Sequence, residues 1–424
     1  MQTAGIIAEF NPFHNGHALL IQTLHRQNCP AILCTMSGPF TQRGEASVCS
    51  KWARAQMAVL EGVDLVIELP FFYAVRSAYE FARGGIHLLY SLGTTHLAFG
   101  SEYTDENSLS QIAGILSEEP APYVESLHKY LQTGMGFAAA RTAALQEFFS
   151  PPEKAGHLTT LLHAPNTILA LEYLHVLKDT HFPMAPFIAA RTGAGYHDET
   201  MQSLASAQAV RRFLYQNTSG NNKEILHQAL PESSFHLLQQ EIHRGRCPIQ
   251  MPAFDFMVLS QIRKSSPAEL SKIFEMREGL ENRIFKQAFH CGTLEDLVQA
   301  VSGRRYPHSR IRRLLLYILM GLTQKQADFL QSEIFPRYVH VLAASKQGLQ
   351  YIKQLKSQPD CPVFLSGGRE IRRFLQQTDP GLAVSQAMLR LDLQASNLYA
   401  LGFPQPGQRM GDTDFHEGAF FLKH

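Results

Sequence analysis

The stretch 5–17 constrains this chain more than any other part, because an apolar strand, a turn and two histidines follow one another there. Residues 6–10 form a β-prone run, and Asn11-Pro12 ends that run and turns the chain. We expect a helix from about His14, so that His14 and His17, three residues apart, lie on one helical face. This order of elements indicates a nucleotide site.

The chemistry of this turn favours phosphate. The first turn of a helix offers unpaired backbone N–H groups and the positive end of the helix dipole. Two imidazoles add donors, and Gly16 leaves room for a phosphate or a ribose to approach the backbone. The alternative is that two histidines on a surface helix face solvent or are satisfied by their neighbours. The position directly after the first strand favours the functional interpretation.

Strand-like and helix-like runs alternate through the first half of the chain. We predict strands at 5–10, 31–35, 64–68, 95–99 and 186–190, and helices at 17–26, 50–61 and 77–92. This is the βαβ pattern of a parallel sheet. Ligands of such sheets bind beyond the carboxyl ends of the strands, where His14, Ser37-Gly38 and Gly100-Ser101 fall. The sequence therefore predicts an α/β, Rossmann-like parallel sheet with several loops around one site.

Further motifs occur along nearly the whole chain, at 8–17, 36–44, 51–54, 64–70, 98–102, 165–166, 193–198, 304–313 and 395–399. Together they resemble the bacterial tRNA(Met) cytidine acetate ligase family, which lies in the HIGH-motif nucleotidyltransferase superfamily. That superfamily binds ATP on a Rossmann-like sheet and attacks its α-phosphate. The chain contains no G-x-x-x-x-G-K-[ST] loop and no G-x-G-x-x-G fingerprint. It also lacks a Lys-Met-Ser-Lys-Ser type loop, which argues against a truncated class I aminoacyl-tRNA synthetase.

The resemblance implies a specific reaction. Acetate attacks the α-phosphorus of ATP to give acetyl-adenylate and pyrophosphate, and the acetyl group passes to N4 of the wobble cytidine, position 34, of elongator tRNA(Met). The product is N4-acetylcytidine. Mg²⁺ is expected on the phosphates. His14 and His17 are the catalytic residues in this interpretation, because they stabilise the transition state at the α-phosphate.

The resemblance also implies a set of ATP contacts. One signature, 204–211, resembles a Ser/Thr-rich turn that opens a helix carrying an arginine, although Gln208 stands where Thr is usual. The predicted ATP-binding residues are Ile7, Ala8, Glu9, Phe10, Asn11, Pro12, Phe13, His14, Asn15, Gly16, His17, Ala18, Leu19, Leu20, Gly100, Asn166, Arg191, Ser206 and Arg211.

Structural alternatives exist for five of these residues. Gly100 can simply permit a tight turn. Asn166 can cap the helix expected near Thr167, and Ser206 can be only an N-cap. Arg191 and Arg211 can be exposed charges. Two further cations, Arg43 and Lys51, are left open between phosphate binding and solvation.

A basic segment lies between residues 301 and 350, where eight Lys and Arg face two acids. Such a segment can bind a polyanion, and Tyr306 and His308 add rings that can stack on exposed bases. The alternative is a solvated helix face whose arginines pair with acids elsewhere in the fold. With the family resemblance, we expect tRNA binding by Arg304, Arg305, Arg310, Arg312 and Arg313.

Helical periodicity dominates the second half of the chain. We predict a nucleotidyltransferase domain at 1–215 and a mainly α-helical domain at 216–424, with the linker at 217–222. The predicted helices cover 223–230, 235–244, 257–264, 280–288, 294–301, 311–322, 338–355 and 370–377. We expect this half to bind tRNA.

Besides Gln208, three departures from the family pattern are visible. Pro39 stands where Asn is usual, Ser50 stands where Asp is usual, and the segment 340–344 lacks the arginines of the family. We expect the first two to affect nucleotide or acetate placement, and the third to weaken RNA contact there.

Two other functions compete with this interpretation. One is an adenylyltransferase that joins AMP to a small phosphorylated metabolite. The other is a tRNA-binding protein in which the nucleotide fold is vestigial.

Composition points to an ordinary cytoplasmic enzyme. The 424 residues carry a net charge of +1, and the longest apolar run, 314–322, is too short to cross a bilayer. The N-terminus begins with a strand and has no basic segment of a leader peptide. Six cysteines form no C-x-x-C pair, so we expect reduced thiols and no zinc or other metal site.

Overall fold

The computed structural model describes residues 3–149, 162, 164–191, 205–216, 223–333, 336–357 and 362–423. Within these residues a sheet of eight strands runs in the order β5-β4-β1-β2-β3-β6-β7, with β8 paired to β6. The strands are β1 (Thr3–Ala8), β2 (Ala31–Ser37), β3 (Leu65–Leu69), β4 (His96–Ser101), β5 (Ala185–Ala190), β6 (Tyr338–Ala344), β7 (Val363–Leu365) and β8 (Phe420–Phe421). Strands β1 to β5 pair in parallel, whereas β6 runs antiparallel to β3. The predicted parallel, Rossmann-like sheet is confirmed.

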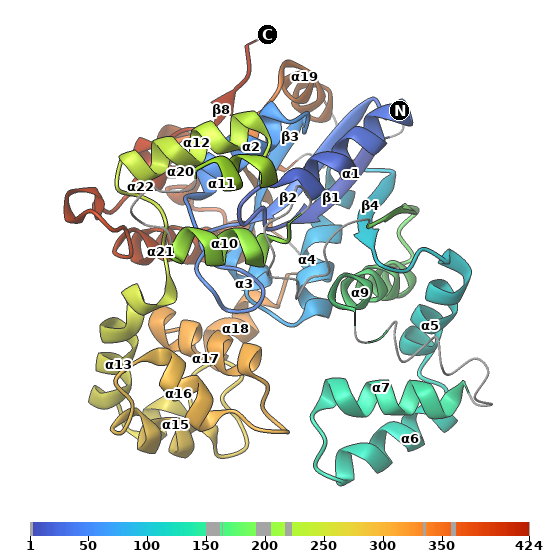
Figure 1. Ribbon diagram of the computed structural model, residues 1–424, viewed down its shortest axis with the longest axis vertical. Helices are drawn as coiled ribbons and strands as arrows, with labels where there is room; N and C mark the ends of the chain where they lie inside the picture. Colours follow the sequence, from blue (N-terminus) through green and yellow to red (C-terminus); the bar gives the residue numbers. More distant parts are fainter. Residues whose placement is uncertain are drawn as a thin grey trace.

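Helices connect the parallel strands, and the three helices predicted at 17–26, 50–61 and 77–92 are confirmed. The first half contains α1 (Asn15–Arg26), α2 (Lys51–Leu60), α3 (Phe71–Ala74), α4 (Ala78–Ser91), α5 (Glu106–Glu118), α6 (Ala121–Gln132), α7 (Phe137–Phe148), α9 (Pro165–Thr180) and α10 (Ala207–Gln216). Figure 1 shows these elements in blue to green around the sheet.

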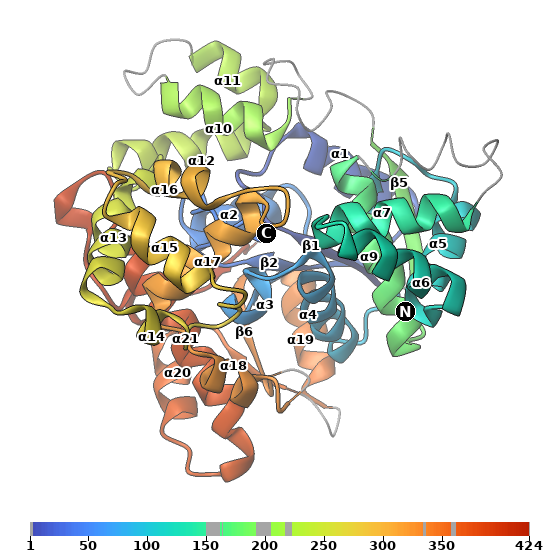
Figure 2. The ribbon, with the colours of Figure 1, turned by 90° about the horizontal axis from the view of Figure 1, so that it is seen from below.

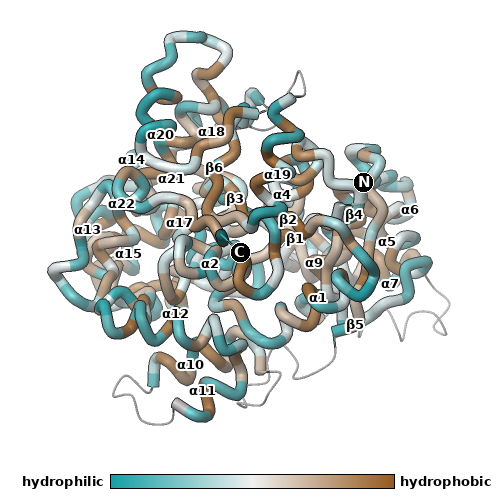
Figure 3. Tube along the Cα trace, turned by 90° about the horizontal axis from the view of Figure 1, so that it is seen from above, coloured by the Kyte–Doolittle hydropathy of each residue, from teal (hydrophilic) through white to brown (hydrophobic). Residues whose placement is uncertain are grey.

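The sheet separates two hydrophobic cores. Ile7, Leu33 and Ile67 point to one side, where α4, α9 and α19 (Lys346–Leu355) pack. Their neighbours in sequence, such as Ile6 and Cys34, point to the other side and share a core with α1, α2 and α10. Alternate side chains of a strand face opposite sides, so both faces of these strands must be apolar. Figure 3 accordingly shows β1, β2, β3 and β6 in brown at the centre of the molecule.

Helix α4 packs very close to β1. A Cβ atom added at Gly85 would lie 2.6 Å from a side-chain carbon of Ile7. A glycine is therefore required on α4 for the helix to reach the strand. This close packing fixes the strand whose carboxyl end carries the predicted nucleotide site.

The second half is mainly helical, as predicted. It contains α11 (Lys223–Ala229), α12 (Glu232–His243), α13 (Asp255–Lys264), α14 (Pro267–Leu270), α15 (Leu280–Ala288), α16 (Leu294–Val301), α17 (His308–Met320), α18 (Gln324–Leu330), α19, α20 (Gly368–Leu375), α21 (Ala383–Ala400) and α22 (Thr413–His416). Three short 3₁₀ helices cover Met251–Phe254, Pro380–Leu382 and Pro406–Gln408. The boundary at residue 215 stays a prediction, and the predicted linker 217–222 lies outside the described residues.

One predicted helix of this half is wrong over its first part. The segment predicted as a helix at 338–355 begins with strand β6, and α19 starts only at Lys346. All seven residues of β6 are buried, so the strand has no alternation of apolar and polar residues. A short, fully buried strand cannot be told from a buried helix by periodicity alone. The second half of the chain therefore extends the sheet of the first half.

Two groups of helices stand on opposite sides of the molecule below the sheet, α5–α7 and α13–α17 (Figures 1 and 2). Loops of the two groups meet at Gly136, which precedes α7. A Cβ atom at Gly136 would lie 2.8 Å from the carbonyl oxygen of Arg304. The turn before α7 thus packs directly on the basic segment.

Candidate active site

The turn after β1 is tight and firmly held. Phe10 has a φ of 44°, in the left-handed region that non-glycine residues rarely adopt. The guanidinium of Arg54, which is fully buried, donates to the carbonyl oxygens of Glu9 at 2.6 Å and Ser37 at 3.0 Å. Arg54 therefore joins the carboxyl ends of β1 and β2. The sequence motif 51–54 contained this arginine, but its structural function was not predicted.

The two histidines are arranged differently from the predicted helical face. His14 is the N-cap of α1, and its Nδ1 accepts from the backbone N–H of Gly16 at 3.0 Å. Nδ1 of His17 accepts from the backbone N–H of His14 at 3.2 Å. The two rings lie side by side, with centroids 3.8 Å apart. The predicted proximity is confirmed, and reciprocal capping produces it.

This capping fixes the tautomer of both rings. A neutral imidazole whose Nδ1 accepts a hydrogen bond carries its proton on Nε2. Burial, together with the charges of Arg191 and Arg211, lowers the pKa of His14 to about 3. Burial and the neighbouring His14 and Arg191 lower the pKa of His17 well below its ordinary value. Both rings are therefore neutral near pH 7 and offer Nε2–H as donors.

Gly16 is needed for the packing of the histidine pair, in addition to leaving room for a bound ligand. A Cβ atom at this position would lie 2.8 Å from Cε1 of His14. Any side chain would displace the capping imidazole. The sequence predicted a glycine needed for ligand approach, and the structure adds this packing reason.

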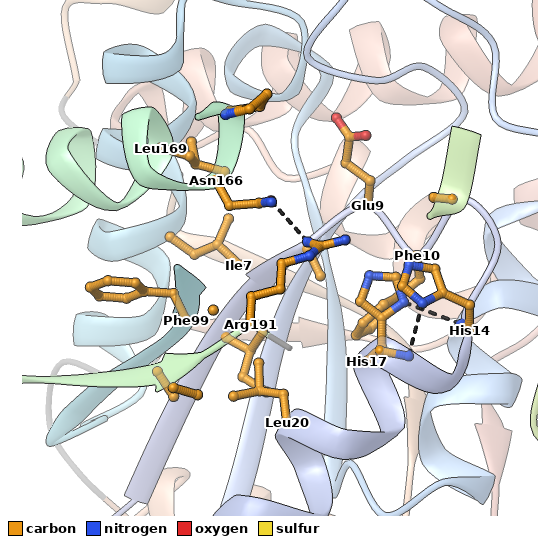
Figure 4. A pocket seen from close by; sticks show the side chains of 18 of the residues that line it. Ile7, Glu9, Phe10, His14, His17, Leu20, Phe99, Asn166, Leu169 and Arg191 are labelled. Atoms are coloured by element: carbon orange, nitrogen blue, oxygen red, sulfur yellow. Dashed lines mark hydrogen bonds between the residues drawn. The ribbon is translucent and has the colours of Figure 1, made fainter. Parts of the chain in front are cut away.

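A cavity of about 510 Å³ opens beside the histidines, at the carboxyl ends of β1, β4 and β5. Figure 4 shows its side chains from close by. The predicted ATP-binding residues that line it are Ile7, Ala8, Glu9, Phe10, Asn11, His14, Gly16, His17, Leu19, Leu20, Gly100, Asn166 and Arg191. Six others do not line it: Pro12, Phe13, Asn15, Ala18, Ser206 and Arg211.

The reasons for these six positions differ. Phe13 and Ala18 are buried in the core that α1 shares with the sheet. The Asn15 side chain donates to the carbonyl oxygen of Gln228 at 2.8 Å. Ser206 accepts from the N–H of Ala209 at 3.1 Å and caps α10, as its alternative interpretation held. Binding by these residues stays a prediction.

One wall of the cavity was not predicted as a site. Phe81, Phe99, Leu169 and Tyr173 line it from α4, β4 and α9. Apolar residues at helical spacing are indistinguishable from core residues in a sequence. Phe99 alone carried a signal, because it lies in the motif 98–102 next to Gly100.

Gly100 occupies open space. A Cβ atom added there would meet no protein atom within 4 Å, apart from its chain neighbours. Its φ lies outside the left-handed region, so the backbone does not require a glycine. The alternative that Gly100 permits a tight turn is thus not supported by its conformation.

Asn166 and Arg191 lie next to each other in the cavity. Nη1 of Arg191 donates to Oδ1 of Asn166 at 2.9 Å, and Figure 4 shows the arginine between Asn166 and the histidines. Helix α9 has Ala164 as its N-cap, so the alternative that Asn166 caps this helix is wrong. Arg191 points into the cavity and is not an exposed loop charge. The adjoining motif 193–198 lies outside the described residues.

Arg211 reaches the turn after β1 from outside the cavity. Its Nη1 donates to the carbonyl oxygen of Asn11 at 2.9 Å, and its Nη2 lies 3.6 Å from Glu45. Arg43 lines the cavity, whereas Lys51 does not. A guanidinium at this turn adds positive charge beside the histidines.

Lys51 belongs to a buried ion-pair cluster. Its ammonium is 2.7 Å from Glu68, 3.0 Å from the Ser396 hydroxyl, and in contact with Asp414. His340 contributes an Nδ1 that lies 2.7 Å from Glu68. Glu68, His340 and Asp414 are close enough to hold a metal ion, but the ammonium of Lys51 already contacts both carboxylates. His340 lies in buried strand β6, and the weak RNA contact expected there stays a prediction.

The departures Pro39 and Ser50 lie beside this cluster. Both line a cavity of about 20 Å³, together with Lys51 and Trp52, that is separate from the large one. Ser50 accepts from the N–H of Ala53 at 3.2 Å and caps α2. A serine thus supplies the cap that an aspartate would also supply.

The predicted RNA-binding arginines are partly paired. Arg305 and Arg310 lie 2.8 and 3.7 Å from Glu278, and Arg312 lies 3.4 Å from Glu45 and 2.9 Å from Glu295. The alternative of pairing with acids therefore holds for these three arginines. Arg304 is exposed and has no side-chain partner among the residues that the structure describes.

Comparison with known proteins adds an independent finding. A family model described as HIGH Nucleotidyl Transferase matches residues 1–414. A tRNA(Met) cytidine acetate ligase of Syntrophomonas wolfei is 41% identical over 417 residues, which cover 98% of both chains. A second tRNA(Met) cytidine acetate ligase, of Acetivibrio thermocellus, is 34% identical, and the alignment covers 100% of both chains. The chain belongs to the tRNA(Met) cytidine acetate ligase family of HIGH nucleotidyltransferases.

Solved structures of this family have the same fold. The chain superimposes on the apo crystal structure of Thermotoga maritima TmcAL with a TM-score of 0.91 at 31% identity, and each chain is covered completely. A second structure, of TmcAL bound with alpha-thio ATP, gives a TM-score of 0.89 at the same identity and coverage. Among the described helices of the present chain, none combines the length and hydropathy needed to cross a bilayer.

Proposed function

We propose that this protein activates acetate with ATP and transfers the acetyl group to N4 of the wobble cytidine, position 34, of elongator tRNA(Met). The observation that carries the proposal is the pair of neutral histidines beside Arg191 in the large cavity. The names of the relatives and the bound nucleotide of TmcAL support it. A tRNA substrate also favours a cytoplasmic location.

The first step is an attack by an acetate oxygen on the α-phosphorus of ATP. A new oxygen–phosphorus bond forms, and the bond to pyrophosphate breaks. Like charges repel in this step, so the site must neutralise phosphate oxygens and align the reactants. The Nε2–H groups of His14 and His17 donate to oxygens of the α-phosphate. Arg191 supplies a fixed positive charge.

The second step is acetyl transfer. The N4 amine of cytidine attacks the carbonyl carbon of acetyl-adenylate, a carbon–nitrogen bond forms, and AMP leaves with the bonding electrons. The amine loses one proton to AMP or water. The apolar wall of Phe81, Phe99 and Leu169 limits access of water to the mixed anhydride.

The cavity can hold Mg²⁺ if the phosphates of the bound ATP supply most of its ligands. Mg²⁺ is commonly held by one or two carboxylates together with substrate phosphates. Glu9 is the one carboxylate among the described lining residues, and its Oε1 accepts from the N–H of Gln42 at 2.9 Å. Glu9 would hold Mg²⁺ together with the substrate phosphates, and the ion would supply charge neutralisation there.

The basic segment is the proposed RNA contact. Arg304 and Arg305 are exposed, and Arg310, Arg312 and Arg313 continue along α17 toward the loop at Gln42. Arginines neutralise phosphates whatever the sequence, so they provide affinity more than choice of base.

The test is ATP–pyrophosphate exchange with purified protein and Mg²⁺, with and without acetate. Exchange that requires acetate and is lost in His14→Ala and His17→Ala establishes carboxylate adenylation at this site. Acetylation is then measured by mass spectrometry of tRNA(Met) nucleosides. Exchange that requires a phosphorylated metabolite instead would favour an adenylyltransferase. Binding of tRNA without any ATP binding would favour the vestigial function.

A further inference from the structure

Glu102 lies one residue after β4 and is exposed. Its Oε1 accepts from the side-chain amide of Asn166 at 2.5 Å. Its Oε2 accepts from the backbone N–H of Thr167 at 2.8 Å and from the Thr167 hydroxyl at 2.9 Å. One carboxylate thus serves two purposes, because it caps the start of α9 and holds the Asn166 side chain.

These bonds decide which way the Asn166 amide points. A carboxylate only accepts hydrogen bonds, and a guanidinium only donates them. The NH₂ group of Asn166 must therefore face Glu102, which leaves Oδ1 to accept from Arg191 at 2.9 Å. The hydrogen bonds run in one direction, from Arg191 through Asn166 to Glu102.

Arg191 depends on this direction for its position. It leaves the end of β5, and Figure 4 shows its side chain reaching across the cavity between Asn166 and the histidine pair. If the amide turned over, its NH₂ group would face the guanidinium, and two donors would oppose each other. Arg191 would then leave the place from which it reaches the phosphates.

We propose that Glu102 is a positioning residue that sets the orientation of the Asn166 amide and thereby fixes Arg191 in the nucleotide cavity. The proposal rests on the proposed function, since it takes ATP as the ligand of this cavity. Glu102 is not among the residues that line the cavity, whereas its partner Asn166 is, so the effect of Glu102 on the ligand passes through Asn166.

The chemistry of a glutamine at this position provides the test. In Glu102→Gln the carbonyl oxygen can still accept from Thr167, so the cap of α9 is kept. Its NH₂ group then faces Asn166, whose amide must turn over. We expect the Kd for ATP to rise about tenfold, as for the loss of a hydrogen bond to a charged group, with the Tm nearly unchanged.

A second variant separates positioning from capping. In Glu102→Gln/Asn166→Asp the glutamine NH₂ donates to one oxygen of the new carboxylate, and the other oxygen accepts from Arg191. The net charge equals that of the wild type, and the direction of the bonds is restored. We expect most of the ATP affinity to return. Asn166→Asp alone places two carboxylates together and binds ATP more weakly than the double variant.

Glu106→Gln is the matched control, because Glu106 is an exposed glutamate in the first turn of α5. It makes the same change of charge four residues away and should leave ATP binding unchanged. ATP binding is measured by calorimetry, and crystal structures of both Glu102 variants report the position of Arg191 without ATP.

The proposal would be overturned if Glu102→Gln bound ATP as tightly as the wild type. It would also be overturned if the double variant did not regain ATP affinity. Failure of the wild type to bind ATP would refute the proposed function, while the position of Arg191 in the variant crystals would still decide this inference.

Discussion

The buried ammonium of Lys51 provides the sharpest test of how the two halves of the chain hold together. Lys51 is 3% exposed and contacts Glu68, from β3, and Asp414, from α22. Lys51→Met keeps most of the volume of the side chain and removes its charge. Two carboxylates would then stay buried with no ammonium beside them. Removing one partner of a buried ion pair costs roughly 3–5 kcal/mol, so we expect a loss of that size.

The effect should depend on pH in a defined direction. Although burial raises the pKa of Glu68, Lys51 and His340 hold it at about 2, below its ordinary value of 4.5. A carboxyl group with a lowered pKa stabilises the folded state above its unfolded pKa, and this contribution disappears as the pH falls through the folded pKa. The difference between wild type and Lys51→Met should therefore be full at pH 7 and smaller at pH 4.

Urea unfolding at both pH values measures this difference through the midpoint and the slope. Lys129→Met is the matched control, because Lys129 forms a pair with Glu147 at 3.2 Å but is 63% exposed. An exposed pair contributes about 0–1 kcal/mol. If Lys51→Met were no less stable than Lys129→Met, the reasoning about the buried cluster would be refuted.

Three further predictions concern the site. Gly100→Ala should weaken ATP binding about tenfold, because the added methyl group would occupy space that the nucleotide uses, at a cost similar to that of one lost hydrogen bond. The Tm should stay unchanged, because the added Cβ meets no protein atom. Calorimetry measures the binding, and thermal unfolding measures the Tm. Since the pKa of His14 is about 3, the exchange rate should show no inflection from the histidine pair between pH 6 and 8, and a ring of His14 or His17 that titrates in this range by NMR would contradict their neutrality. Arg304→Ala should reduce tRNA affinity and lower the salt slope by about one. A filter-binding titration over several salt concentrations measures it, and an unchanged slope would exclude a phosphate contact.

The strands β1 to β5 and the helices α1, α2 and α4 followed from local pattern, whereas α3 and α5 to α7 were not predicted. Apolar runs ended by turn residues predicted β1 to β5, and the spacing of His14 and His17 predicted their proximity. These features depend on residues that are close in sequence. The capping that pairs the two rings depends on backbone geometry, which the spacing does not contain.

Other parts could not be predicted, because they depend on contacts between distant residues. Lys51 meets Asp414 only after the second half has folded against the first, so its charge had two interpretations in the sequence. Strand β6 is buried on both faces and therefore resembles a buried helix. Glu102 acts on Asn166 across 64 residues, and no motif of the sequence indicates that hydrogen bond.

The antiparallel pairing of β6 with β3 has a consequence for synthesis of the chain. An uncovered strand edge presents unpaired N–H and C=O groups that can pair with another chain. Strand β3 leaves the ribosome long before β6 does, and at about 5–20 residues per second the delay is on the order of tens of seconds. During that interval β3 has no β6 to cover its edge, and such an edge can pair with another chain. The last strands therefore protect the nascent chain from aggregation as soon as they dock.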